Sequence, residues 1–355
     1  MSQLHNRVDR RLLKKRLMEE DFRRVTLSFY RYVILDDPNL VRDRLYAQWD
    51  ALHCFGRIYV AREGINAQMS IPEHHFEKFK AELYAWPEFA EVPFKIAVED
   101  DGKSFFKLSV KVKDKIVADG LDDGAFDVTN VGKHLSAIEF NEAMSDPNAI
   151  VVDMRNHYES EVGHFEGAIC PDVDTFRDEL PLVADMLEDK KDAKLLLYCT
   201  GGIRCEKASA YFRHLGFADV NQLHGGIIEY ARQVKYQGID NKFRGKNFVF
   251  DERLGERISD EIIAHCHQCG EPADTHVNCA NEACHLLFIQ CEACAQKYAH
   301  CCSQACADIL ALPEEAQKAL RKGIRKAEQN IFRKGRYRET AGTIMQKLRP
   351  VKNDA

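Results

Sequence analysis

The first third of the chain alternates between strand-like and helix-like hydrophobic patterns. The segments are 24–35, 38–52, 55–71, 72–86 and 106–113. The first and third are rich in β-branched and aromatic residues, and a break at Glu63-Gly64 divides the third into two strands. The second and fourth have helical apolar spacing and begin with a proline, which suits the first turn of a helix. This order predicts a ferredoxin-like α+β domain, a split βαβ arrangement, over residues 24–118.

The last strand of this predicted domain has two chemically different faces. Its apolar positions are Phe106, Leu108, Val110 and Val112. The positions between and after them are Lys107, Ser109, Lys111 and Lys113. A basic strand face could carry an RNA backbone, which makes the three lysines candidate RNA-binding residues. An ordinary solvated sheet face is the alternative interpretation.

A second domain is predicted beyond a segment that lacks periodicity. Residues 118–132 are rich in Gly, Asp and Asn and predict a linker. After it, the capping-box pair Ser136 and Glu139 opens a helix with an apolar face. Two short apolar strands follow, at 149–155 and 194–199. Such strands alternating with helices predict a parallel α/β domain over residues 131–240.

The composition changes abruptly after residue 260, because nine of the thirteen cysteines fall between Cys266 and Cys306. Eight of them form closely spaced pairs: Cys266 with Cys269, Cys279 with Cys284, Cys291 with Cys294, and Cys302 with Cys306. Since two such pairs close one tetrahedral shell, the spacing predicts up to two structural zinc sites over residues 260–310. Alternative ligands are Cys301, His285 and His300. Free cytosolic thiols are the other interpretation.

The net charge of −6 conceals a basic C-terminus. Residues 318–352 contain twelve Lys/Arg against Glu328 and Glu339, which leaves +10. We therefore predict a basic helical tail over 311–355, which favours a polyanionic partner. A solvated helix without a partner is the alternative.

The sequence indicates a cytoplasmic protein. Its N-terminus lacks the apolar segment of a secretory signal, and Glu19, Glu20 and Asp21 argue against an organellar transit peptide. No run of about 18 apolar residues exists, so we expect no contact with the membrane interior. Thirteen cysteines without an export signal favour the cytosol, where thiols serve metals or catalysis more often than disulfides.

The stretch CTGGIRC, residues 199–205, joins a buried strand to a helix. Chemistry in a parallel α/β domain lies beyond the carboxyl ends of the strands, where Cys199 falls. The backbone of this loop belongs to Thr200, Gly201, Gly202 and Ile203. The two glycines allow successive N–H groups to point inward as an anion-binding nest. Together with Arg204 and the positive end of the helix, this nest should lower the pKa of Cys199 well below about 8.5 and give a thiolate nucleophile.

CTGGIRC resembles the active-site loop of rhodanese-domain proteins, in which the first cysteine carries a persulfide. The stretches VVDMRNHYESEVGHFEGAI and NQLHGGIIEY are similar to the rhodanese signature upstream and to the final strand with its glycine turn. Six residues from Cys199 to Arg204 suit sulfur, whereas the related phosphatase domains have one residue more. In such domains polar residues of the first stretch tie the sheet and loops together; here they are Asp153, Arg155, His164 and Glu166.

Cys205 has two interpretations. It is either a resolving thiol that attacks a persulfide or sulfenate on Cys199, or a packing residue at the first position of the helix.

The order of the three regions makes the resemblance specific to one family of rhodanese-domain proteins. A ferredoxin-like domain, a rhodanese domain with YCTGGIRCEKASAY and a cysteine-rich C-terminal region together resemble the bacterial tRNA uridine hydroxylases. The resemblance implies an enzyme that uses molecular oxygen to convert the wobble uridine of tRNA to 5-hydroxyuridine, with Cys199 as the catalytic cysteine. It also implies that the N-terminal domain and the basic surfaces, including Lys107, Lys111 and Lys113, hold tRNA.

No motif in the sequence indicates how molecular oxygen would be activated. The chain has no Gly-rich dinucleotide fingerprint, no flavin motif and no clear 2-His-1-carboxylate set for non-haem iron. Two other functions therefore stay open. One is a sulfurtransferase that passes sulfur from Cys199 to a small thiol or to tRNA. The other is a zinc-stabilised RNA-binding adaptor, against which the intact loop argues.

Overall fold

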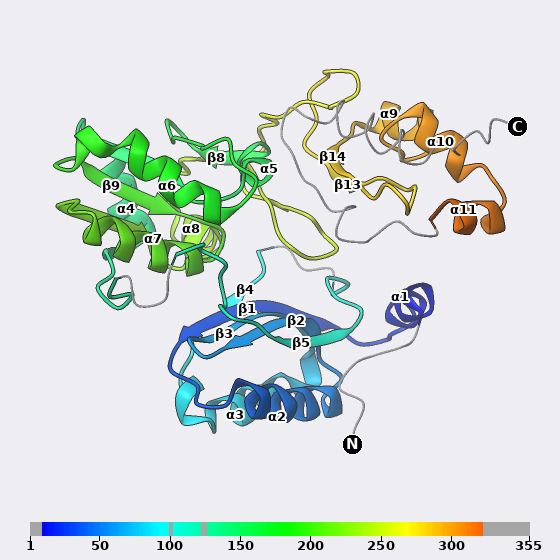
Figure 1. Ribbon diagram of the computed structural model, residues 1–355, viewed down its shortest axis with the longest axis horizontal. Helices are drawn as coiled ribbons and strands as arrows, with labels where there is room; N and C mark the ends of the chain where they lie inside the picture. Colours follow the sequence, from blue (N-terminus) through cyan, green and yellow to red (C-terminus); the bar gives the residue numbers. More distant parts are fainter. Residues whose placement is uncertain (1–8, 99–101, 122–125, 322–355) are drawn as a thin grey trace, which may run out of the picture.

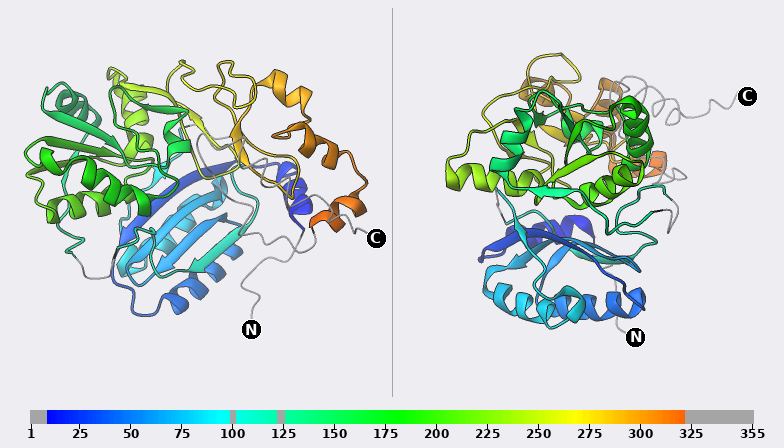
Figure 2. Two further views of the ribbon diagram at one scale, coloured as in Figure 1. Left: turned by 45° about the horizontal axis from the view of Figure 1, so that its top comes forward. Right: turned by 90° about the vertical axis from the view of Figure 1, so that its left-hand side faces the viewer.

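The computed structural model describes residues 9–98, 102–121 and 126–321. Three regions lie side by side in Figures 1 and 2: an α+β domain, a parallel α/β domain and a cysteine-rich region. This is the predicted combination of folds. A helix that the sequence analysis did not predict, α1 (Arg10–Met18), precedes the first domain. The described chain ends with α11 (Glu314–Arg321), so most of the predicted basic tail lies outside the described residues.

The first domain is a five-stranded sheet with two helices on one face. Its elements are β1 (Arg24–Tyr32), α2 (Pro38–Ala51), β2 (Phe55–Ala61), β3 (Gly64–Pro72), α3 (Phe76–Tyr84), β4 (Lys95–Ile96) and β5 (Leu108–Val112). The strand order is β4-β1-β3-β2-β5, and the first four strands pair antiparallel. This is the predicted split βαβ arrangement. The core between the sheet and the helices includes Trp49, Phe79 and Ile58. Figure 2 shows the two helices below the sheet.

The strand predicted over residues 106–113 lies at the opposite edge of the sheet from the edge that the sequence predicts. The alternation over residues 106–113 predicts the fourth strand of the split βαβ unit, but β4 takes that position beside β1. The two residues of β4 are too few for a visible alternation. β5 instead extends the other edge, parallel to β2. Its predicted alternation is confirmed, because Leu108 and Val110 join the core.

The sheet face opposite α2 and α3, here called the open sheet face, is polar. Core residues of β3 are Ile65, Ala67, Met69 and Ile71, so the alternate positions Asn66 and Gln68 lie on the open sheet face. Two rows of side chains cross this face in register. They are Tyr30, Asn66, Tyr59 and Lys111, and Lys95, Ser28, Gln68, Arg57 and Ser109. The rows connect the β4 edge with the lysine-bearing β5 edge.

The second domain is a parallel sheet of order β6-β10-β9-β7 covered by helices on both faces. Its elements are β6 (Lys133–Leu135), α4 (Ala137–Met144), β7 (Ala149–Asp153), α5 (His157–Ser160), β8 (Gly163–Phe165), α6 (Phe176–Met186), β9 (Lys194–Tyr198), α7 (Ile203–His214), β10 (Asp219–Leu223) and α8 (Gly226–Gln237). The capping box is present: the Ser136 N–H donates to the Glu139 carboxylate at 2.8 Å.

The third region contains short elements only. They are β11 (Phe243–Asn247), β12 (Glu256–Arg257), β13 (His276–Asn278), β14 (Leu287–Ile289), α9 (Glu292–Lys297) and α10 (Gln304–Leu310). β11 pairs with β8 of the second domain. Tyr158 of α5 also packs in one cluster with Phe248, Cys266 and Ile289. The cysteine-rich region is therefore docked on the second domain. Among the described helices, none combines the length and apolar character that a membrane span needs.

A buried lysine joins the first two domains. Lys207 lies on α7, and its Nζ is 2.8 Å from a carboxylate oxygen of Glu63 and 2.5 Å from one of Asp119. Glu63 belongs to the turn between β2 and β3, and Asp119 to the linker. The Tyr30 hydroxyl adds a hydrogen bond of 3.1 Å to Glu206 of α7. These contacts hold the open sheet face against the loop that follows β9.

Candidate active site

The loop between β9 and α7 has the conformation expected of an anion-binding nest. Gly202 is the N-cap of α7 with φ of 93°, the left-handed region that favours glycine. A Cβ at this position would lie 3.0 Å from the Tyr30 hydroxyl. The Gly202 N–H donates to Cys199 Sγ at 3.1 Å. The sulfur thus faces backbone donors at the N-terminus of a helix.

These surroundings lower the pKa of Cys199. Burial alone would raise it, but the Cys205 thiol donates a hydrogen bond, Arg204 supplies a positive charge, and the N–H groups of both residues also donate. The outcome is a pKa of about 6. The thiolate therefore predominates at neutral pH.

Cys205 is the third residue of α7, because the helix begins at Ile203. It therefore does not occupy the first helical position suggested by the sequence. Its side chain is buried, and burial together with the Cys199 thiolate raises the pKa of Cys205 well above its usual value. Cys205 is thus protonated at neutral pH, and this geometry favours a hydrogen-bond donor over a second thiolate.

Arg204 is held by a residue that the sequence analysis did not single out. Its Nη1 and Nη2 donate to the two carboxylate oxygens of Glu159 at 2.6 and 2.8 Å. Its Nη2 also lies 3.4 Å from Thr200 Oγ1. Glu159 closes a capping box with Asn156 at the start of α5, and this pattern signals a helix start only. No sequence signal pairs Glu159 with an arginine 45 residues away.

The glycine turn at the start of α8 contacts the backbone of the same loop. The Ile227 N–H donates to the Cys199 carbonyl at 3.0 Å. A Cβ at Gly226 would lie 2.5 Å from that carbonyl oxygen, and the φ of Gly226 is 68°. Glycine is therefore required for the helix to approach the loop so closely.

Four polar residues of the rhodanese-like signature bind structural partners. Arg155 forms two hydrogen bonds with Asp153, at 2.8 and 2.6 Å, and a third with the Gly163 carbonyl at 2.6 Å. His164 Nδ1 lies 2.9 Å from the Ser160 carbonyl. Glu166 pairs with Arg244 of β11. These contacts tie β7, β8 and β11 together.

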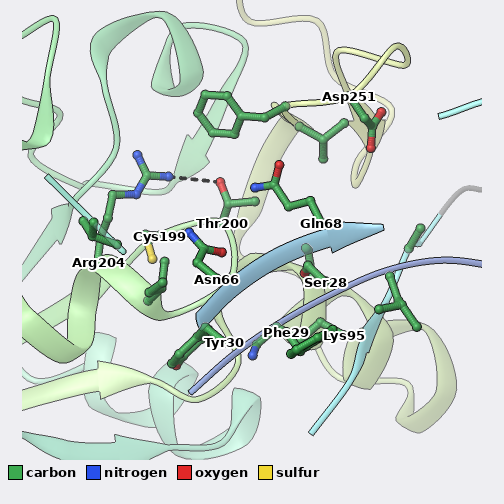
Figure 3. A pocket seen from close by; sticks show the side chains of 18 of the residues that line it. Ser28, Phe29, Tyr30, Asn66, Gln68, Lys95, Cys199, Thr200, Arg204 and Asp251 are labelled. Carbon is green, nitrogen blue, oxygen red and sulfur yellow. Dashed lines mark hydrogen bonds between the residues drawn. The ribbon is translucent and has the colours of Figure 1, made fainter. Parts of the chain in front are cut away.

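A cavity of about 320 Å³ lies between the Cys199 loop and the open sheet face. Three segments line it: the sheet with Ser28, Tyr30, Asn66, Gln68 and Lys95, the second domain with Phe176, Cys199, Thr200, Ile203 and Arg204, and the segment after β11 with Val249, Phe250 and Asp251. Figure 3 shows Asn66 and Gln68 projecting from β3 toward the loop. The volume and the mixed lining suit a small organic group. Cys199 is 0% exposed to solvent and lines this cavity, so the cavity offers a route by which a reactant can approach its sulfur.

Lys95 is a second cation at the cavity, which sequence analysis missed because β4 carries no periodic signal. Its Nζ lies 4.2 Å from the centre of the Tyr30 ring. Burial lowers the pKa of Lys95 to about 8, although the negative charges of Cys199 and Glu206 oppose this shift.

The cysteine pairs converge as two groups that could each hold a metal ion. One group is Cys266, Cys269, Cys291 and Cys294, and the other is Cys279, Cys284, Cys302 and Cys306. Within each group all ligand atoms lie within 4.8 Å of one another. The pairs are therefore interleaved along the chain, first with third and second with fourth. Among the described residues, neither group includes Cys301, His285 or His300.

The three candidate RNA-binding lysines, Lys107, Lys111 and Lys113, are all exposed. They alternate with the core residues of β5 and therefore share the open sheet face with Asn66 and Gln68. Lys113 Nζ lies 5.8 Å from the centre of the Tyr59 ring. The lysines are thus at the far edge of the sheet that lines the cavity.

Comparison with known proteins covers nearly the whole chain. Three family models match: a UPF0176 acylphosphatase-like domain at 24–116, a rhodanese-like domain at 136–233 and a rhodanese C-terminal region at 244–307. A solved rhodanese-like domain from Anabaena is 19% identical and covers 32% of this chain and 78% of its own, with a TM-score of 0.25.

Two curated relatives bear the same name, tRNA uridine(34) hydroxylase. The relative from Leptospira interrogans is 59% identical, over 94% of this chain and 91% of its own. The relative from Cronobacter sakazakii is 55% identical, over 95% of this chain and 97% of its own. At this identity and coverage, the chain belongs to the tRNA uridine(34) hydroxylase family.

Proposed function

We propose that this protein hydroxylates uridine 34 of tRNA at C5, with molecular oxygen as co-substrate and Cys199 as the reacting residue. The observation that carries the proposal is the position of the Cys199 thiolate at a cavity between two domains, in a chain 53–59% identical to relatives named tRNA uridine(34) hydroxylase. The conversion of C–H to C–OH by O₂ also requires two electrons and two protons, and releases water. An external two-electron reductant is therefore part of the proposal.

A thiolate beside a uracil ring has a defined first step. Addition of Cys199 Sγ to C6 forms an S–C bond and moves the C5–C6 π pair onto C5 and O4, so that C5 becomes the nucleophilic carbon. The pKa of about 6 supports this role, because the attacking thiolate predominates at neutral pH. Lys95, a buried cation facing the same cavity, would stabilise the negative charge on O4.

Binding of tRNA would begin at the lysine edge of the open sheet face. Lys107, Lys111 and Lys113 supply charge for phosphates, and the in-register row from Lys111 through Tyr59 to Asn66 leads from this edge to the cavity. The basic residues beyond Arg321 would add to the same electrostatic attraction.

Two structural zinc ions fit the cysteine groups. Sulfurs bound to one zinc at about 2.3 Å lie roughly 3.8 Å apart at the corners of a tetrahedron. The sulfurs of Cys284 and Cys302 are 3.6 Å apart, those of Cys302 and Cys306 are 3.7 Å apart, and those of Cys269 and Cys291 are 3.6 Å apart. Four protein ligands at each site would leave no open position, which supports a structural role.

The test is nucleoside mass spectrometry of tRNA treated with the protein and an added two-electron reductant under ¹⁸O₂. We expect one labelled oxygen at position 34 with wild-type protein and none with Cys199→Ser. Hydroxylation with oxygen from water would overturn the assignment of O₂ as the source.

A sulfurtransferase is the second candidate, because the donors that stabilise a thiolate would also stabilise the terminal sulfur of a persulfide. When a sulfane-sulfur donor is added to the same experiment, a thiolated nucleoside without any hydroxylated one would favour this candidate over the first.

A further inference from the structure

The two carboxamides of β3 face the reacting sulfur from the opposite wall of the cavity. Asn66 and Gln68 line the cavity together with Cys199 and Thr200. Their side chains point from the sheet toward the loop in Figure 3. Both are partly exposed, whereas their neighbours in β3 fill the core. A polar group that the fold leaves at a cavity wall is available to a ligand.

The orientation of the Asn66 amide is fixed by its surroundings. Its Nδ2 donates to the Ile116 carbonyl at 3.3 Å. Because a carbonyl only accepts, the nitrogen must face Ile116 and the oxygen must point away from it. Ile116 is itself held, since its N–H donates to Glu63 at 2.7 Å and Glu63 pairs with Lys207. Asn66 thus presents a positioned acceptor, Oδ1.

Gln68 is the adjustable member of the pair. Within the described residues its terminal amide forms no hydrogen bond that would fix its orientation. Its neighbours across the strands are Ser28 and Arg57. The amide of Gln68 can therefore rotate to offer its N–H₂ donor to a ligand oxygen.

An acceptor beside a donor fits uracil but also fits N4 and N3 of cytosine, so discrimination depends on which ring atom Asn66 faces. When C6 of the base lies at Cys199, N3 lies on the opposite side of the ring, toward Asn66. The Watson–Crick edge of uracil has an N3–H donor between two acceptor oxygens, whereas cytosine has an acceptor at N3 and a donor at N4. Enzymes that act on a base take it out of the stack and read this edge in the active-site pocket. Asn66 Oδ1 would accept from N3–H, and the Gln68 amide would donate to a ring oxygen.

We propose that Asn66 and Gln68, contributed by the N-terminal domain, are specificity-determining residues that read the Watson–Crick edge of a flipped uracil while Cys199 approaches its C5–C6 bond. This inference rests on the proposed function for the identity of the base. It assigns base recognition and reactive sulfur to different domains.

The expected discrimination is large, because a site built around a hydrogen bond rejects an analogue that leaves its polar group unpaired. Cytosine opposes Asn66 Oδ1 with a second acceptor. 3-Methyluracil replaces the N–H by a bulkier methyl group and keeps both oxygens, so it perturbs the Asn66 contact and leaves the oxygen acceptor for Gln68.

The experiment measures binding of anticodon stem–loop RNAs carrying uridine, 3-methyluridine or cytidine at position 34. The protein carries Cys199→Ser so that no chemistry intervenes. We expect this background to prefer uridine to 3-methyluridine by about a hundredfold, and Asn66→Ala to reduce that preference below about tenfold. Gln68→Ala should weaken uridine binding by about tenfold and leave the preference over 3-methyluridine unchanged. Gln237→Ala, an exposed carboxamide at the end of α8, is the matched control and should change nothing.

The outcomes separate this inference from the proposed function. Undiminished discrimination in Asn66→Ala, with RNA still bound, would overturn the inference even if the wild-type protein hydroxylates uridine. Discrimination that depends on Asn66, in a protein that yields no hydroxyuridine, would support the inference and reject the proposed function. A merely structural role of Asn66 would lower affinity for all three RNAs equally, which also overturns the inference.

Discussion

Cys199 and the cysteines of the two metal groups share one side chain and differ in what surrounds the sulfur. At Cys199 the stabilising groups are fixed parts of the protein: N–H donors, a thiol and Arg204. In each metal group four sulfurs converge within 4.8 Å, and four thiolates at that spacing would need a cation between them. Fixed donors leave a sulfur lone pair free to react, whereas a metal ion occupies it. On the proposed roles, the position of the positive charge would separate a reactive thiolate from structural ones.

The largest effect should follow removal of metal. We expect up to two zinc ions per chain, and loss of one removes binding free energy on the order of 10 kcal/mol from the stability of the cysteine-rich region. Cys302→Ser should lose one zinc, whereas Cys301→Ser, its neighbour outside both groups, should keep both. Elemental analysis of protein purified without added metal gives the stoichiometry. A value near zero, with the thiols titrating freely, would remove the basis of the comparison.

The second effect concerns activity and leaves stability unchanged. Cys199→Ser should lower tRNA hydroxylation by at least about a thousandfold, because the nucleophile is gone. Its thermal unfolding midpoint should stay close to that of the wild-type protein, since little volume changes. Turnover of tRNA and calorimetry measure the two quantities. A serine variant that modifies tRNA at the wild-type rate would show that Cys199 is not the reacting residue.

The third prediction tests whether the reactivity of Cys199 is set locally. Alanine at Lys107, Lys111 and Lys113 together should weaken tRNA binding and flatten its log–log salt dependence by about 0.7 to 0.9 for each lost phosphate contact. The alkylation rate of Cys199 should not change.

A matched triple variant at Lys78, Lys190 and Lys191 makes the same charge change away from the open sheet face. We expect it to keep the wild-type salt dependence. Unchanged tRNA affinity in the first variant would leave the β5 lysines as an ordinary solvated face.

The smallest effect concerns one hydrogen bond. The alkylation rate of Cys199 should rise with pH around a midpoint of about 6, because deprotonation creates the nucleophile. Cys205→Ala removes a donor to the thiolate and should raise the midpoint by about one unit. Cys205→Ser keeps a donor and should leave it near the wild-type value. A midpoint unmoved in both variants would remove Cys205 from the set of stabilising groups.

Sequence patterns predicted the features of the site that are formed by residues close together in the chain. The glycine pair, Cys199 and Arg204 lie within one short loop, and the cysteines that could hold metal come in pairs of close spacing. In each case the geometry follows from a few neighbouring residues. What the sequence left undecided was which pairs join, because closure of the metal groups depends on the path of the chain between them.

The missed residues are those whose partners lie far away in the chain. Glu159 meets Arg204 because α5 follows β7, α7 follows β9, and these two strands are parallel neighbours in the sheet. Lys95 reaches the cavity from a strand too short to be recognised. Asn66 and Gln68 looked like the polar side of an ordinary strand. Their role depends on which domain covers that face of the sheet, and no local pattern encodes this packing.

Lys207 limits how far this protein can be treated as modular. The helix that tunes the Cys199 thiolate also carries Lys207, whose partners Glu63 and Asp119 belong to the N-terminal half and the linker. Exchange of either half for that of a distant rhodanese would break this buried network, and a buried charge left without any partner costs about 3 to 5 kcal/mol. The two halves must therefore be inherited together, and recombination within the linker is expected to yield non-functional chimeras unless all three charges are exchanged as a set.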